Sequence, residues 1–161
     1  MVHNGIPIVG SVASPNGFGL ICGGADRVTV NDRDVSVACR LPNTELAGGV
    51  VMTELGGNHW WSGLCEFGDV MERVGSTVRI LGSTALALIA CALNRCVATV
   101  LARYQPWDVA GGLAICRAAG VSVFNWQGDR DPFPLNGLVA TRLNDPSPIL
   151  QVTRTLASRL R

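Results

Sequence analysis

The sequence predicts a layered α/β domain, and three observations support this prediction. The chain has 161 residues, of which 48% are apolar and 16% charged, so it can bury a sizeable core. Short segments rich in β-forming residues dominate the first half. From Thr77 onward, β-branched segments alternate with segments of helical length, as expected for a sheet covered by helices.

The first half predicts short strands followed by one helix. The expected strands, with a turn at 15–17 between the first two, are residues 6–13, 18–22, 28–30, 35–37 and 49–53. Residues 28–30 and 35–37 alternate apolar and polar side chains around the polar segment 31–34, which predicts a solvent-facing hairpin. Residues 60–74 have helical length, with apolar side chains at spacings of three and four. Those apolar residues are Trp61, Leu64, Phe67 and Met71.

The second half predicts alternating strands and helices. The expected strands are residues 77–81, 97–102, 121–124 and 138–141, and the expected helices are residues 84–93, 107–119 and 146–160. Ser83 or Thr84 can cap the first of these helices by accepting from its free amides. That helix has almost no polar face, so we expect it to lie buried between layers. Gly120 is expected to end the second helix.

Composition narrows the class of protein. The formal net charge is +1 and no basic stripe or acidic block is present, which argues against nucleic acid or a membrane surface as a partner. The longest apolar run, residues 85–93, is about half of a membrane span. The first seven residues lack the pattern of a secretion signal. The six cysteines are scattered and lie mostly in apolar segments, which predicts buried free thiols and a reducing cytoplasm.

Asp108 opens the predicted helix that follows the strand at 97–102. At that position its carboxylate can project from the edge of the sheet, while the small residues Val109, Ala110 and Gly111 allow close packing behind it. Equally, an acidic residue in the first turn stabilises the helix dipole without any further role. The residues around Asp108 leave both interpretations open.

Gly82-Ser83-Thr84 precedes the alanine-rich helix. A glycine followed by a capped helix start offers free amides to an oxygen-rich ligand. Every capped helix has such amides, so this segment alone also fits an ordinary cap.

The two segments together resemble the inositol monophosphatase family. The matching residues read Gly82-Ser83-Thr84-Ala85-Leu86 and then Trp107-Asp108-Val109-Ala110-Gly111, and residues 2–7, 51–56 and 118–120 are also similar to family segments. The resemblance implies the C-terminal part of a five-layer αβαβα sandwich, formed by residues 1–161 as one domain.

The resemblance also implies a phosphomonoesterase that uses Mg²⁺ ions held by carboxylates. It assigns Asp108 as a metal ligand. It assigns Gly82, Ser83 and Thr84 as contacts to the substrate, a phosphorylated sugar or polyol such as inositol monophosphate.

The sequence departs from the family pattern at the metal site. The family motif DPxDGT, which supplies two metal carboxylates and the phosphate-binding amides, does not occur in it. Because Mg²⁺ requires near-octahedral coordination, Asp108 alone should bind it weakly. We therefore expect the chain to be a truncated domain with little phosphatase activity. We expect the other acids to be solvated surface residues: Asp26, Asp32, Asp34, Glu45, Glu54, Glu66, Asp69, Glu72, Asp129, Asp131 and Asp145.

A second departure concerns substrate choice. The family often has an acidic residue where this sequence has Leu101, with Arg103 nearby. Arg103 would favour a second anionic group on the substrate, or it is an ordinary surface arginine.

Two hypotheses for the whole chain follow. It is part of a working phosphatase whose N-terminal half is missing from the record, or it is a non-enzymatic pseudophosphatase remnant that binds a partner. In both cases uncovered apolar sheet surface predicts a homodimer or other self-association.

Overall fold

The computed structural model describes residues 1–14, 17–39, 45–55 and 60–159. The helices are α1 (Ser36–Cys39), α2 (Leu64–Arg73), α3 (Thr84–Ala92), α4 (Pro106–Ala118) and α5 (Ser147–Arg159). The strands are β1 (Val2–His3), β2 (Ile6–Pro7), β3 (Val9–Ser14), β4 (Gly19–Gly24), β5 (Arg27–Val30), β6 (Arg33–Asp34), β7 (Val50–Thr53), β8 (Thr77–Ile80), β9 (Ala98–Leu101), β10 (Ser122–Asn125) and β11 (Leu138–Thr141).

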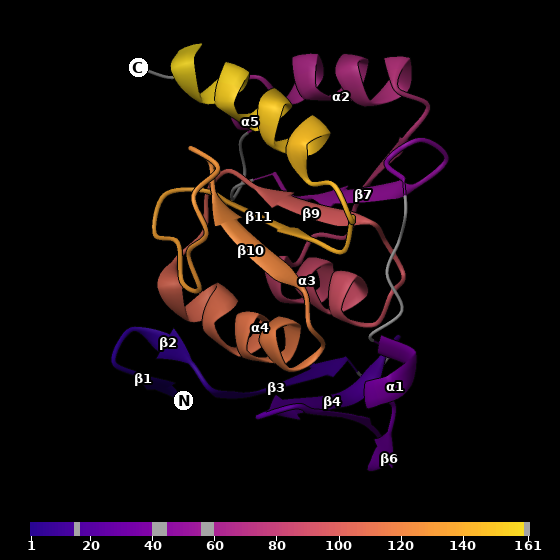
Figure 1. Ribbon diagram of the computed structural model, residues 1–161, viewed down its shortest axis with the longest axis vertical. Helices are drawn as coiled ribbons and strands as arrows, with labels where there is room; N and C mark the ends of the chain where they lie inside the picture. Colours follow the sequence, from indigo (N-terminus) through magenta and orange to yellow (C-terminus); the bar gives the residue numbers. More distant parts are fainter. Residues whose placement is uncertain (15–16, 40–44, 56–59, 160–161) are drawn as a thin grey trace.

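The described elements stack as alternating layers of helix and sheet (Figure 1). Helices α2 and α5 cover one face of a five-stranded sheet, and α3 and α4 cover the other. Beyond α4 lies a four-stranded antiparallel sheet with the order β3-β4-β5-β6. The predicted layered α/β fold is therefore confirmed.

The five-stranded sheet has the order β10-β11-β9-β7-β8. Strand β7 pairs in parallel with both β8 and β9, whereas β11 runs antiparallel to β9 and to β10. The carboxyl ends of the three parallel strands consequently meet at one edge of the sheet. The residues that follow these strands are thereby brought together at that edge.

The hairpin predicted at 28–37 differs from expectation in its second strand. Strand β6 is Arg33–Asp34, paired with β5 through a turn at Asn31 and Asp32, which have φ of 47° and 64°. The Asp34 carboxylate accepts from the backbone amide of Ser36 at 2.9 Å. This local bond turns residues 36–39 into the short helix α1 instead of continuing the strand. The turn predicted at 15–17 lies partly outside the described residues.

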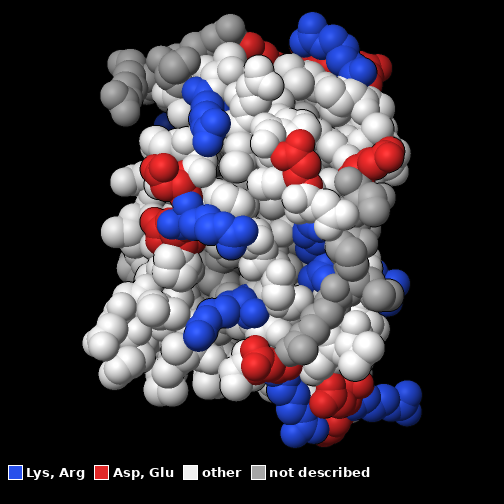
Figure 2. Space-filling view, viewed as in Figure 1, with Lys and Arg blue, Asp and Glu red and all other residues white. Residues whose placement is uncertain are grey.

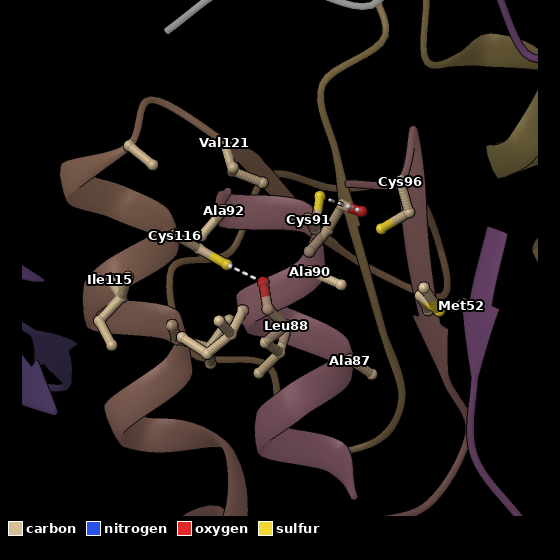
Figure 3. Close-up of a cluster of buried hydrophobic side chains, with 14 of the residues drawn as sticks. Met52, Ala87, Leu88, Ala90, Cys91, Ala92, Cys96, Ile115, Cys116 and Val121 are labelled. Atoms are coloured by element: carbon tan, nitrogen blue, oxygen red, sulfur yellow. Dashed lines mark hydrogen bonds between the residues drawn. The ribbon is translucent and has the colours of Figure 1, made fainter. Parts of the chain in front are cut away.

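Helices α3 and α4 form the buried layer between the two sheets. The side chains from Ala87 to Ala92 on α3 are buried, as their lack of a polar face predicted. In Figure 3 the Cys116 thiol on α4 donates to the Leu88 carbonyl oxygen on α3, at 3.4 Å. The absence of a side chain at Gly112 lets the two helices approach, because a Cβ there would lie 2.9 Å from Leu88.

The opposite face of α4 packs against the four-stranded sheet. There Gly10 on β3 lies against the backbone of Gly111, so close that a Cβ on Gly10 would overlap the Gly111 carbonyl group. Small residues on both faces of α4 thus allow it to fit between a helix and a sheet. The close packing expected around Gly111 is confirmed.

Helices α2 and α5 close the other face of the five-stranded sheet. Phe67, Met71 and Ile149 pack with Val51 and Val100 of the central strands in one apolar cluster. The apolar spacing predicted for α2 is confirmed. The helix begins later than residue 60 because Gly63 adopts a left-handed φ of 90° immediately before it.

The six cysteines are thiols, and four of them are buried. Burial raises the pKa of the Cys116 thiol, so that thiol stays protonated. In the described part of the chain, no helix has the length and apolar character needed to cross a bilayer. On the face shown in Figure 2, acidic and basic side chains are interspersed and no large patch of one sign forms.

Candidate functional site

A cleft of about 880 Å³ lies where the parallel strands end. Gly82, Ser83, Thr84 and Asp108, the four site residues that the sequence predicted, all line it. The first three follow β8, and Asp108 follows β9 in the first turn of α4. Because β8 and β9 flank β7 in parallel, the sheet itself brings these two segments to one place.

The loop between β8 and α3 has a defined backbone geometry. Gly82 has a φ of 77°, in the left-handed region that favours glycine. Ser83 caps α3, since its hydroxyl accepts from the amide of Leu86 at 3.4 Å. Among the described residues, the first-turn amides of Thr84 and Ala85 have no acceptor. These N–H groups are available to a ligand oxygen at the end of the helix that borders the cleft.

Glu54 holds this loop, which corrects the expectation that it is a solvated surface acid. It is 7% exposed, and its two carboxylate oxygens accept from the backbone amides of Leu81 at 3.1 Å and Gly82 at 2.9 Å. Hydrogen bonds to a charged group contribute about 1.5–3 kcal/mol each. The carboxylate is buried because it immediately follows β7, the central strand of the parallel set. Glu54 therefore fixes the backbone that precedes Ser83.

Asp108 is exposed and already makes one backbone contact. One of its carboxylate oxygens, Oδ2, accepts from the amide of Gln105 at 3.0 Å. This bond closes the first turn of α4, as the helix-stabilising interpretation expects. No donor among the described residues contacts the other oxygen, so the carboxylate can also face a ligand in the cleft. The two interpretations of Asp108 are compatible in this geometry.

Arg103 and Tyr104 form another part of the cleft wall. The Tyr104 hydroxyl donates to the carbonyl oxygen of Pro134 at 2.7 Å and so holds the loop that carries Leu135 over the cleft. Burial, together with the nearby charge of Asp131, raises the pKa of Tyr104, which therefore remains a neutral donor. Arg103 is exposed in the cleft and has no ion-pair partner among the described residues.

The described residues do not by themselves fit a complete Mg²⁺ site. They contain no group of three or more His, Cys, Asp or Glu side chains placed to hold a metal ion. Both oxygens of Glu54 are engaged by backbone amides, which leaves Asp108 as the carboxylate directed to the cleft. Mg²⁺ is usually held by one or two carboxylates together with waters and substrate phosphate oxygens. Asp108 can supply one such ligand.

The role of Glu54 was missed although a sequence signal for it existed. It directly follows the strand Val50–Thr53, which was correctly predicted. In parallel sheets the residues after the strand ends gather at one edge, so an acidic residue there is a site candidate. Its contacts are to backbone amides, and no residue-type pattern reports such contacts.

Comparison with known proteins identifies the family of this chain. Residues 1–157 match the model of the inositol monophosphatase family. An inositol-1-monophosphatase of Mesorhizobium japonicum is 36% identical over 111 residues, which cover 69% of this chain and 41% of that protein.

Solved structures show the same fold. An IMPase of Thermotoga maritima matches with a TM-score of 0.83 and 23% identity, covering 99% of this chain and 61% of that one. The inositol monophosphatase of Anabaena (Nostoc) sp. PCC 7120 matches with a TM-score of 0.80 and 23% identity, covering 95% and 62%. The chain thus spans less than two thirds of the length of these relatives. On the strength of the family match and the shared fold, this chain belongs to the inositol monophosphatase family.

Proposed function

We propose that this chain provides the polyol-binding loop and one metal-binding carboxylate of a Mg²⁺-dependent phosphomonoesterase. The substrate is a sugar or polyol phosphate such as inositol monophosphate. The observation that supports the proposal is the convergence of Gly82, Ser83, Thr84 and Asp108 on one cleft. Family membership and the inositol-1-monophosphatase relative point to the same substrate class.

The residues of the cleft suit a polyol bound beside a charged group. The free amides of Thr84 and Ala85 can donate to substrate oxygens, and the Thr84 hydroxyl can donate or accept. Asp108 lies across the cleft and, in the proposal, supplies one ligand to Mg²⁺. The remaining protein ligands of the metal are proposed to come from residues that this chain does not contain. The reduced state of the six cysteines supports the proposal of a reducing cytoplasm as the site of action.

The purified chain alone is expected to release no phosphate from inositol 1-phosphate above background, with or without Mg²⁺. The reason is that the described residues offer no cluster of ligating side chains around Asp108, so Mg²⁺ should bind there only weakly. Colorimetric measurement of inorganic phosphate checks this. Mg²⁺-dependent hydrolysis that disappears in Asp108→Asn would contradict the expected inactivity, although it would support the proposed reaction.

The reaction itself is tested in a chimera. In this chimera, a segment of the M. japonicum protein is fused to the start of the present chain. The segment is the part of that protein that precedes the region matched by this chain, and it is included to supply the missing carboxylates. The proposal expects Mg²⁺-dependent hydrolysis of inositol 1-phosphate by the folded chimera. A folded chimera without activity would contradict it.

The alternative function is a non-enzymatic pseudophosphatase that binds a partner. The observation that favours it is the absence, among the described residues, of a carboxylate cluster around Asp108. An inactive but correctly folded chimera is the result this alternative expects. An active chimera would rule out this alternative, because it would show that this chain still supplies its part of a working phosphatase.

The isolated chain is also proposed to self-associate. Val9 on the edge strand β3 and Leu20 on β4 are 48% and 45% exposed, on a sheet whose other face packs against α4. Exposed apolar edge strands promote association between sheets. Sedimentation velocity is expected to show dimers or larger species at micromolar concentration. A monomer with a single cooperative melting transition would contradict this expectation.

A further inference from the structure

The carboxylate of Glu54 lies at the amino-terminal end of α3 but is turned toward the loop that precedes the helix. Its oxygens accept from Leu81 and Gly82, the two residues before the cap Ser83. At 7% exposure it is largely shielded from water, and it nevertheless lines the cleft. A negative charge therefore lies directly against the β8–α3 loop, which borders the cleft.

This placement has two physical consequences. First, the amides of Leu81 and Gly82 are engaged, so a ligand meets the N–H groups of Thr84 and Ala85 instead. Second, a carboxylate beside a helix amino terminus offsets the positive end of the helix dipole. An uncompensated helix terminus attracts phosphate, and a carboxylate already beside it weakens that attraction while leaving the N–H groups able to donate to neutral oxygens.

Across the cleft the charge pattern is different. Arg103 lines the wall that follows β9, and no acidic side chain among the described residues forms an ion pair with it. The β9–α4 side of the cleft thus carries a cation, Arg103, together with the carboxylate of Asp108, whereas the β8–α3 side carries a charge-compensated helix end. Among the described residues that line the cleft, Arg103 is the basic side chain, so it is the cation available to an anionic group.

We infer that Glu54 is a specificity-determining and positioning residue, which makes the β8–α3 loop a binding site for neutral hydroxyl groups and disfavours phosphate there. It fixes the loop through two backbone amides and supplies the charge that discriminates between the two ligand types. This inference rests on the proposed function only for the identity of the polyol. The discrimination against phosphate follows from the charge and geometry of Glu54.

The test is Glu54→Gln, which preserves the size of the side chain but removes its charge and one of its two acceptors. The unmodified chain and the variant, both labelled with ¹⁵N, are titrated separately with myo-inositol and with inorganic phosphate. The backbone amide signals of Thr84 and Ala85 report binding at the loop. Glu72→Gln, an exposed acid on α2 outside the cleft, is the matched control for the loss of one charge.

The inference predicts opposite changes for the two ligands. In Glu54→Gln, phosphate should bind at the loop about two- to fivefold more tightly, the range expected for removing a charge beside a helix terminus. Inositol should bind more weakly, because the loop loses one of its two anchors. The amide proton signals of Leu81 and Gly82 should move upfield, which reports the lost hydrogen bonds without any ligand. A merely structural role would weaken both ligands together.

Several results would overturn the inference. They are unchanged Leu81 and Gly82 signals in Glu54→Gln, equal weakening of both ligands, or a Glu72→Gln response equal to that of Glu54→Gln. If the variant fails to fold, the titration of the unmodified chain tests the inference. In that chain, phosphate should shift the amide signals of Thr84 and Ala85 less than inositol does at equal concentration, and an equal or larger shift with phosphate would contradict the inference. Failure of the proposed function has a separate signature, namely an inactive chimera whose loop still discriminates against phosphate.

Discussion

Asp108→Asn is expected to lower the Mg²⁺-dependent hydrolysis of inositol 1-phosphate by the chimera by a factor of about 100 or more. The substitution keeps the shape of the side chain and an oxygen that can accept from the Gln105 amide, which bonds Oδ2 of Asp108 at 3.0 Å. It removes the negative charge that the proposed metal requires. Steady-state phosphate release as a function of Mg²⁺ concentration measures the effect.

The control for this prediction is Asp69→Asn. Asp69 is an exposed acid on α2 and does not line the cleft, so the same chemical change there should leave activity within about twofold. Equal activities of the Asp108→Asn and unmodified chimeras would contradict the role of Asp108. That result would reduce Asp108 to a residue that closes the first turn of α4.

Gly10→Val is expected to destabilise the chain by about 3 kcal/mol or more. A side chain at Gly10 would overlap the backbone carbonyl group of Gly111, and backbone cannot move aside as a flexible side chain can. The β3–β4 layer would be pushed away from α4, the helix that carries Asp108. For a chain of this size the melting temperature should fall by about 6–12 °C.

The matched control is Gly68→Ala on α2. A Cβ at Gly68 would have no heavy atom within 4 Å, so alanine fits without a clash. Because glycine costs helix stability relative to alanine, this variant should gain about 0.5–1 kcal/mol. Thermal unfolding followed by circular dichroism compares the two variants. A Gly10→Val variant as stable as the unmodified chain would show that the contact between β3 and α4 is looser than described.

The sequence predicted the second half of the fold because its signals there are local and consistent with one another. The alanine-rich run of α3 predicted a buried helix, and of the two residues expected to cap it, Ser83 or Thr84, the structure has Ser83. Pro106 and Gly120 bounded α4 closely. These signals depend on backbone preferences near each residue, so they persist whatever the chain packs against.

Features that depend on distant contacts could not be predicted in the same way. Glu54 was expected to be solvated. Its position directly after β7 marks it as a residue at the sheet edge, but nothing near it in sequence shows that the amides of Leu81 and Gly82 will lie against it. The second strand of the β5–β6 hairpin was misplaced because the Asp34–Ser36 hydrogen bond outweighs the alternating pattern at 35–37. In both cases a side-chain contact to backbone determined the outcome.

The convergence of Gly82-Ser83-Thr84 and Asp108 was inferred from a family resemblance rather than from geometry. The structure supplies the physical reason, which is the parallel pairing of β7 with β8 and β9. The sequence could not reveal that pairing, because strand order is determined by tertiary packing.

The most direct test of the central claim is an amide titration of this chain with inositol 1-phosphate and Mg²⁺. If one ligand is bound by both segments of the cleft, the signals of Ser83 and Thr84 should move together with those of Gln105 and Asp108, with a single dissociation constant. Amides of the distant β4–β5 pair should remain still. Movement confined to one of the two segments, or spread evenly over the chain, would contradict the claim that these segments form one site.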